Sequence, residues 1–471
     1  MQFRLARRGV SLFFLWIYVI SRTGGLASAQ DLGHMTRGQS RAVFGYDTNA
    51  DFLGFNPRFR QLHRQYSTEL TRLQRALAQQ NRAGRTRPCA RQIFLEARWL
   101  VYYTADFVRI KQRLEALRAL LRQPHDPPGC EAQSATDGSF DHCSQAWFLK
   151  VDANCEVIED LAAEGKKPPY PLHFLDRINS PVKLRAYLDS VLISDVRRSG
   201  EDKSYEMNIG GTDLMRFITG EIPTDYRFDP QLKQTLLDYL DNRWQDPQTG
   251  FFGGWYRTPT GVRKTANLST TFHIAAYLHG RLKHWPQIIQ TTLAMQDHEF
   301  PYGWLEEGHM SNHHDFDVVR LLRYGWPDMS ETQRAQARVA IQKMLDFCLK
   351  ETLNPDGSFK MMDEDTVASS YSLPVAFLQE VGYFEPGRRF WTDAEFPQSP
   401  DVARRIAAHL RSLHLDDPEA KKTLRLLESL DQPKLVKPSR GWIIGGVSGL
   451  LLVGLLWHHS LRTRTVQRSR A

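Results

Sequence analysis

Amphipathic helical patterns fill most of the chain, with short turns between them. Apolar residues recur every three to four positions in segments such as FLEARWLVYYTADFVRIKQRLEALRALL and LRAYLDSVLISDV. This spacing places the apolar side chains on one face of a helix. Regular alternation of apolar and polar residues, which is typical of half-buried strands, is almost absent from the sequence. The pattern therefore predicts an all-α protein.

A repeated unit organises the middle of the chain. In each unit an amphipathic helix leads into a turn where a glycine lies beside aromatic residues, and a second helix follows. The turn glycines are Gly250, Gly303 and Gly357, and the second helices end at Gly280, Gly325 and Gly382. The expected N-caps of the second helices are Ser269, Asn312 and Ser369. The turns lie roughly 50 residues apart, a period that indicates a repeat architecture, so each hairpin must bury its apolar face on its neighbours.

The repeat also resembles a known superfold. The stretch TGFFGG…ANLSTTFHIAAYL, echoed by DGSFKM…ASSYSLPVAFL, is similar to the glycine–aromatic repeats of the α/α toroid superfold, over residues 180 to 390. That superfold includes prenyltransferase and terpene-cyclase repeats, glycoside hydrolases and polysaccharide lyases. The resemblance implies a barrel of about five to six helical hairpins. It leaves the chemistry open, because toroids host unrelated reactions.

Both ends of the chain carry membrane-targeting patterns. A basic start, an apolar stretch over residues 11–20 and the small residues Ala27, Ser28 and Ala29 predict a signal peptide cleaved before Gln30, with an uncleaved anchor as the alternative. The uncharged stretch GWIIGGVSGLLLVGLLW and the arginine-rich tail after it predict a transmembrane helix. The bulk of the protein is then expected outside the cytoplasm, in the cell envelope and anchored by its C-terminus.

These patterns divide the chain into six parts. They are a signal peptide (1–29), an N-terminal helical region with four cysteines (30–175), the toroid repeat domain (176–432), a linker (433–440), the transmembrane helix (441–457) and a basic cytoplasmic tail (458–471). The composition, 41% apolar and 24% charged, is that of a globular protein. Arginines near the two ends account for most of the net charge of +8, so membrane topology explains it and no nucleic-acid partner is expected.

The cysteines agree with export. Four of the five cluster in the N-terminal region: Cys89, Cys130, Cys143 and Cys155. Four cysteines allow three pairings, which the sequence leaves open, and an oxidising compartment predicts two disulfides. Cys348 stands alone in a helical pattern and is expected to be a small buried residue.

The stretch EEGHMSNHHDFD, residues 306–317, is the densest cluster of candidate catalytic groups. In a helix that starts near Asn312, Asp317 lies one turn after both His313 and His314. A histidine held by that carboxylate is a usable proton shuttle. A metal site needs about three ligands in the right geometry. The structural alternative is an acidic first turn that favours the helix dipole.

In a toroid, the loops before the inner helices share one rim, so the resemblance implies that polar residues converge there. The predicted catalytic residues are His313, His314, Asp317 and Tyr256. The predicted substrate-binding residues are Trp255, Arg257, Arg263, Lys264, Trp304, Glu307 and Asp213. No cofactor is expected, and a divalent metal stays an open alternative.

Three functions remain compatible with the sequence. The first is an envelope enzyme that cleaves or modifies a polysaccharide or another envelope glycan, as a hydrolase with two carboxylates or as a lyase. The second is a binding or scaffold protein, in which the rim charges would pair with one another. The third is a terpene-cyclase-like enzyme, but MDEDT resembles the acidic cyclase motif only in part, because Met362 and Glu364 replace acidic positions.

Overall fold

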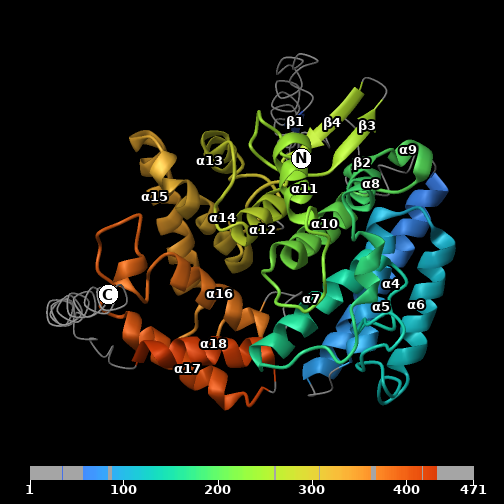
Figure 1. Ribbon diagram of the computed structural model, residues 1–471. Helices are drawn as coiled ribbons and strands as arrows, with labels where there is room; N and C mark the ends of the chain where they lie inside the picture. Colours follow the sequence, from blue (N-terminus) through green and yellow to red (C-terminus); the bar gives the residue numbers. More distant parts are fainter. Residues whose placement is uncertain are drawn as a thin grey trace, which may run out of the picture.

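The computed structural model describes residues 34–35, 57–82, 87–258, 261–306, 308–361, 367–415 and 417–431 (Figure 1). These residues form a mostly helical fold, which confirms the predicted helical class. The helices are α4 (Pro57–Arg82), α5 (Pro88–Tyr103), α6 (Phe107–Leu121), α7 (Trp147–Ala163), α8 (Pro181–Leu192), α9 (Val196–Ser199), α10 (Ser204–Thr219), α11 (Leu232–Tyr239), α12 (Leu268–Tyr277), α13 (Trp285–Ala294), α14 (Asn312–Gly325), α15 (Glu331–Asp346), α16 (Ser369–Glu380), α17 (Ser399–Ser412) and α18 (Pro418–Asp431).

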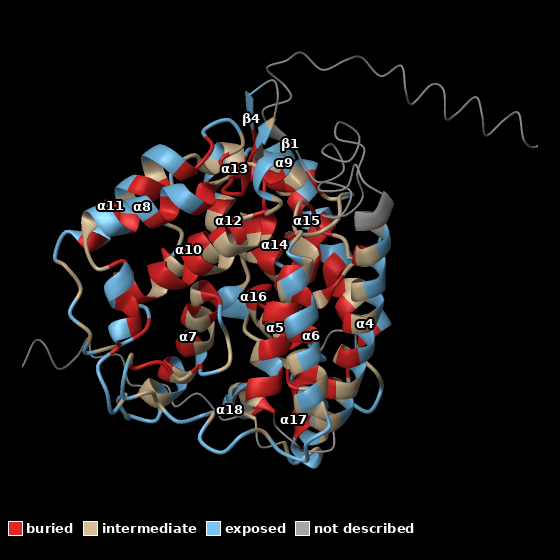
Figure 2. Cartoon of the chain, turned by 90° about the vertical axis from the view of Figure 1, so that its right-hand side faces the viewer, coloured by how far each residue is buried: buried red, intermediate tan, exposed pale blue. Residues whose placement is uncertain are grey.

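A row of contacting helices runs through the molecule. Along this row, α5 packs on α7, α7 on α10, α10 on α12, α12 on α14, α14 on α16, and α16 on α18. The row curves in Figure 1, and the remaining long helices flank it: α6 on α5, α8 and α11 on α10, α13 and α15 on α14, and α17 on α18. Figure 2 shows buried residues concentrated on α10, α12 and α14 and exposed ones on α4, α6, α8 and α11.

The glycine turns of the repeat are sterically required. Gly250 and Gly357 adopt φ angles of 72° and 90°, where only glycine is free of strain. A Cβ on Gly357 would lie 2.3 Å from the carbonyl oxygen of Arg405 in α17, and one on Gly250 would lie 2.7 Å from the backbone nitrogen of Ile288 in α13. Each turn therefore packs directly on the next flanking helix.

Two flanking helices reach these turns in the same way. Helix α11 continues into a π-helical turn, η3 (Leu240–Trp244), and α15 continues into another, η5 (Phe347–Thr352). A glycine turn follows each of them. This equivalence is the structural counterpart of the sequence repeat.

A small sheet interrupts the helical pattern. It has the order β1-β4-β3-β2, with strands β1 (His34–Met35), β2 (Ile193–Ser194), β3 (Trp255–Thr258) and β4 (Gly261–Thr265). Strands β3 and β4 pair antiparallel, with Trp255 opposite Lys264 and Tyr256 opposite Arg263. Five predicted site residues therefore lie on a β-hairpin, which the sequence pattern did not predict.

One of the two expected disulfides is present. Cys89 is bonded to Cys143, while Cys130, Cys155 and Cys348 are free. The expected second bridge is wrong because the Cys155 thiol is buried beside Asp213 and faces α10. Cys348 is buried as predicted.

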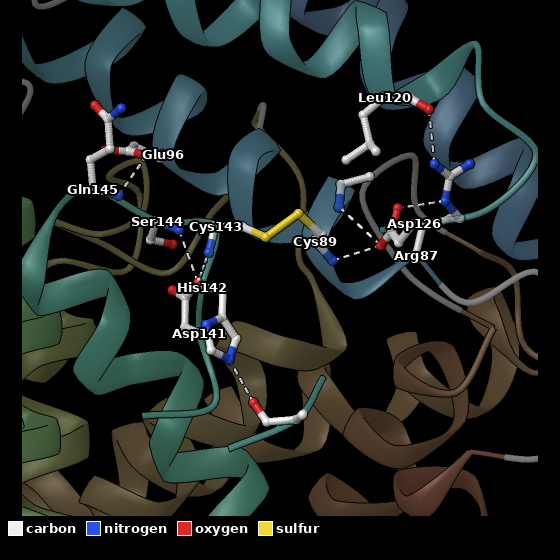
Figure 3. The surroundings of a disulfide bond; sticks show 12 residues. Arg87, Cys89, Glu96, Leu120, Asp126, Asp141, His142, Cys143, Ser144 and Gln145 are labelled. Carbon is white, nitrogen blue, oxygen red and sulfur yellow. Dashed lines mark hydrogen bonds and ion pairs between the residues drawn. A yellow bond between two sulfur atoms is a disulfide. The ribbon is translucent and has the colours of Figure 1, made fainter. Parts of the chain in front are cut away.

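Buried ion pairs surround the disulfide (Figure 3). Arg87 Nε donates to Asp126 at 2.7 Å, and the same carboxylate accepts from the backbone nitrogen of Cys89 at the start of α5. Glu96 is fully buried, pairs with Arg113 at 2.8 Å, and accepts from the backbone nitrogen of Gln145 just before α7. Together these contacts fix where α5 and α7 begin.

The membrane predictions fall on other parts of the chain. Among the helices of the described residues, none is long and apolar enough to cross a bilayer. The predicted signal peptide (1–29), linker (433–440), transmembrane helix (441–457) and tail (458–471) all lie outside the described residues.

Candidate active site

Two of the three cationic residues predicted at the rim, Arg257 and Lys264, pair with acids. On the hairpin, Lys264 Nζ lies 3.5 Å from Asp246 and 4.5 Å from the centroid of the Trp255 ring. Arg257 pairs with Asp195 at 3.6 Å, and Arg263 is buried. These contacts use the cationic side chains to hold the hairpin in place.

Tyr256 is buried at the same hairpin. Its hydroxyl lies 3.2 Å from each carboxylate oxygen of Asp202. Burial, reinforced by the Asp202 charge, raises the pKa of Tyr256 well above its ordinary value. A hydroxyl that holds its proton so strongly is a hydrogen-bond donor to Asp202 rather than a catalytic base.

The two histidines of α14 differ in environment. His314 is buried and stacks on Phe300, with ring centroids 3.6 Å apart. Burial lowers its pKa to about 3. His313 is exposed to solvent, and its ring centroid lies 5.2 Å from that of His314.

The predicted histidine–carboxylate pair does not form. Asp317 is buried, and neither of its carboxyl oxygens has a hydrogen-bond partner. Of the other two residues predicted from this region, Trp304 is buried, and Glu307 lies outside the described residues.

Asp213, predicted as a substrate-binding residue, belongs to a pair of carboxyls. It lies on α10 and interacts with Asp152 of α7. Burial raises the pKa of Asp213 well above its ordinary value, and the Asp152 charge raises it further. Burial followed by the Glu156 charge raises the pKa of Asp152 to about 6. Two adjacent carboxyls whose pKa values are raised in this way can share a proton.

A third carboxylate lies one helical turn along α7. Glu156 pairs with Arg91 of α5 at 3.1 Å, and both side chains remain more than half exposed, at 60% and 58%. The Glu156 charge raises the pKa of Arg91. The ion pair holds the Glu156 side chain next to Asp152 and Asp213, within reach of solvent.

Aromatic and basic groups extend this surface from α10 to α12. His273 Nδ1 lies 3.1 Å from the hydroxyl of Tyr277, and the Arg216 guanidinium lies 5.0 Å from the centroid of the Tyr277 ring. Burial, with the charges of His313 and Arg216, lowers the pKa of His273 to about 4. The imidazole of His273 is therefore neutral at physiological pH. The effect of the His313 charge on this pKa shows that His313 lies near His273.

Several of these groups contact solvent although burial shifts their pKa values. His313 is exposed, yet burial lowers its pKa. Asp152 is only half-buried, yet burial is the largest cause of its raised pKa. We call Arg91, Asp152, Glu156, Asp213 and His273 the inner-face cluster.

The sequence analysis predicted Asp213 as a site residue, but it missed three members of the inner-face cluster, Arg91, Asp152 and Glu156. Asp152 and Glu156 lie four residues apart in the helix WFLKVDANCEVIEDLAA. Two acids on one face of such a helix were the signal that could have found them.

The described residues contain no group of three histidine, cysteine or acidic side chains arranged to hold a metal ion.

No known protein family, no curated protein and no solved structure matches the chain. The chemistry of the site therefore has to be argued from the geometry of its residues.

Proposed function

We propose that the curved row of helices closes into an α/α toroid and that the inner-face cluster lines its interior. The order of contacts from α5 through α18 supports a ring. Glu419 on α18 supports its closure, because its pKa responds to Glu156 of α7 and Arg91 of α5. The first and last helices of the row therefore approach each other.

The proposed activity is hydrolysis of an envelope glycan at the inner-face cluster. One observation carries the proposal: two adjacent carboxyls with raised pKa values, Asp213 and Asp152, lie beside the solvent-exposed Glu156, which pairs with Arg91. Glycosidases commonly use an acid with a raised pKa together with a second carboxylate. The charged and polar side chains of the inner-face cluster suit a sugar chain better than a terpene, which needs an apolar cavity.

In this mechanism Asp213 donates its proton to the glycosidic oxygen as the bond to the anomeric carbon breaks. A water molecule attacks that carbon and gives its proton to Glu156, so that the charges balance. Asp152 is a positioning residue that keeps Asp213 protonated. Arg91 is a positioning residue that holds Glu156 through their ion pair.

A lyase is less well supported by the arrangement. A lyase would need a catalytic base and a cation that neutralises the uronate carboxylate. The sequence analysis predicted Tyr256 as a catalytic residue, and it predicted three cationic substrate-binding residues, Arg257, Arg263 and Lys264. Tyr256 is instead buried against Asp202, and Arg257 and Lys264 are paired with acids. Hydrolysis therefore stands ahead of elimination.

The cell envelope remains the proposed location. The Cys89–Cys143 disulfide fits an oxidising compartment, and the terminal sequence patterns supply the proposed export signal and C-terminal anchor. A glycan of that envelope is the proposed partner, in contact with the exposed residues of the inner-face cluster.

A binding protein without catalysis is the second candidate. The ion pairs of Arg257 and Lys264 favour it, because rim charges that pair with one another are what a scaffold predicts. Such a protein would bind glycans through the inner-face cluster and would leave them intact.

The test is incubation of the purified chain with neutral and acidic polysaccharides, followed by assays for new reducing ends and for the ultraviolet absorbance of unsaturated uronates. We expect new reducing ends without that absorbance, and a loss of at least about 100-fold in Asp213→Asn. Asp238→Asn on the exposed side of α11 is the matched control. Binding without cleavage would favour the second candidate, and full activity in Asp213→Asn would exclude the proposed acid.

A further inference from the structure

A small pocket lies where α14 and α16 begin, and its volume is about 20 Å³. Apolar side chains form part of its wall, namely Phe347, Leu373 and Pro374, and the polar part includes Ser311, Asn312, His313, Lys360 and Ser369. That volume admits about one water-sized group. The pocket is therefore large enough for the charged end of a ligand and too small for a whole sugar ring.

Two helix N-termini converge on this pocket. Helix α14 has 14 residues and α16 has 12, so both have well-developed positive ends. The acid in the first turn of α14 does not compensate this charge, because burial raises the pKa of Asp315 well above its ordinary value and keeps the carboxyl neutral. Helix N-termini of this kind favour anions.

The hydroxyl of Ser311 is the second, independent feature. Ser311 occupies the N-cap of α14 but makes no side-chain cap hydrogen bond. It is only 4% exposed and lines the pocket, and its hydroxyl has no partner among the described residues. An N-cap serine normally bonds to the first turn of its own helix, so here both the hydroxyl and the backbone donors remain available to a ligand.

The neighbouring Asn312 adds a further requirement. Its side-chain nitrogen donates to Thr352 Oγ1 at 3.0 Å, which fixes the amide. Its Oδ1 is buried and has no hydrogen-bond donor. A ligand that carries a hydroxyl beside its anionic group would donate to Asn312 Oδ1 and accept from the Ser311 hydroxyl and the backbone N–H groups. An inorganic anion would only accept from the hydroxyl and the N–H groups.

We propose that this pocket binds the carboxylate of a sugar acid, with the Ser311 hydroxyl and the N-terminal backbone N–H groups of α14 as donors. Lys360, exposed at the wall, adds a positive charge. His313 connects the pocket to the inner-face cluster, where the sugar ring lies. This inference rests on the proposed function and specifies its substrate as an acidic glycan.

The test measures binding rather than turnover. A uronate oligosaccharide and its carboxyl-reduced, neutral counterpart are titrated against the full chain carrying Asp213→Asn, which prevents cleavage. We expect the acidic oligosaccharide to bind at least tenfold more tightly. Adding Ser311→Ala or Lys360→Met should abolish that preference without changing the affinity for the neutral sugar, while Ser429→Ala on α18 should leave the preference intact.

The outcomes separate this inference from the proposed activity. Acid preference that depends on Ser311 and Lys360 supports the pocket even if the wild-type chain cleaves nothing. Equal affinity for the two oligosaccharides, or an equal loss for both in the variants, overturns it even if the chain is a hydrolase. Competition by inorganic phosphate as strong as by a uronate would also overturn it, and Lys360→Met keeps the test decisive should Ser311→Ala fail to fold.

Discussion

At the scale of single residues, the proton-retaining pair depends on a contact between two helices. The sequence placed Asp213 near a ligand but gave no means of pairing it with Asp152, which lies 61 positions earlier in the printed sequence. Burial of both carboxyls is a property of the packed α7–α10 interface. The same limit applies to His313 and Asp317, whose spacing suggested a pair that the packing of α14 does not form.

The first prediction concerns the pH dependence of the proposed acid. Asp152→Asn removes a negative charge that raises the pKa of Asp213. Asp213 in the variant should therefore lose its proton at lower pH, although burial still raises its pKa. We expect the alkaline limb of kcat/KM against pH to shift to lower pH. An alkaline limb that stays in place would show that Asp152 does not tune the acid.

At the scale of elements, helices were easier to predict than strands. Two of the predicted helix starts are close to the observed ones, since α14 begins at Asn312 and α16 at Ser369. The predicted N-cap Ser269 is wrong, because Asn267 accepts the capping hydrogen bond from Thr270. The sequence pattern did not predict the β3–β4 hairpin, because strand β3 has only four residues and pairs with β2, which is distant in sequence.

The glycine turn before α16 provides the second prediction. Gly357→Ala forces a Cβ into a left-handed conformation, 2.3 Å from a backbone oxygen of α17. We expect the free energy of unfolding to fall by about 1–3 kcal/mol or more, measured by urea denaturation. Gly387→Ala is the matched control, because its Cβ would meet no atom within 4 Å, and it should change stability by less than about 0.5 kcal/mol. Equal effects of both variants would contradict the steric argument.

At the scale of the whole molecule, the disulfide and the buried ion pairs join the N-terminal helices to the helical row. The bridge from α5 to the loop before α7 closes 54 residues. Such a loop predicts a stabilisation of about 4 kcal/mol through the unfolded state.

The third prediction follows from that bridge. Cys143→Ser should lower the free energy of unfolding by about 4 kcal/mol in oxidising buffer. Reducing agent should destabilise the wild type and leave the variant unchanged. Ser substituted for the free, half-buried Cys130 is the control and should have a small effect. A reductant-sensitive Cys143→Ser variant would show that another pair of cysteines bridges in solution.

The fourth prediction concerns how global stability varies with pH. Burial raises the pKa of Asp317 well above its ordinary value, so the folded state keeps a proton that the unfolded state releases above about pH 4. Stability is therefore lost as pH rises from there through the folded-state pKa, by about 1.4 kcal/mol per pH unit for one proton. The buried histidines His273 and His314 have lowered pKa values and act in the opposite direction, because the unfolded state takes up protons below about pH 6.5.

Asp317→Asn separates these opposing contributions. The amide does not titrate, and the histidines are common to both proteins, so their effect cancels in the difference between variant and wild type. We expect the variant to gain stability relative to the wild type as pH rises from about 5 to about 8, in denaturant titrations at several pH values. The exposed Asp401 on α17 lacks such burial, so Asp401→Asn should show little of this trend. If the difference for Asp317→Asn were independent of pH, the carboxyl would be ionised in the folded protein, with the nearby Arg320 charge outweighing the effect of burial.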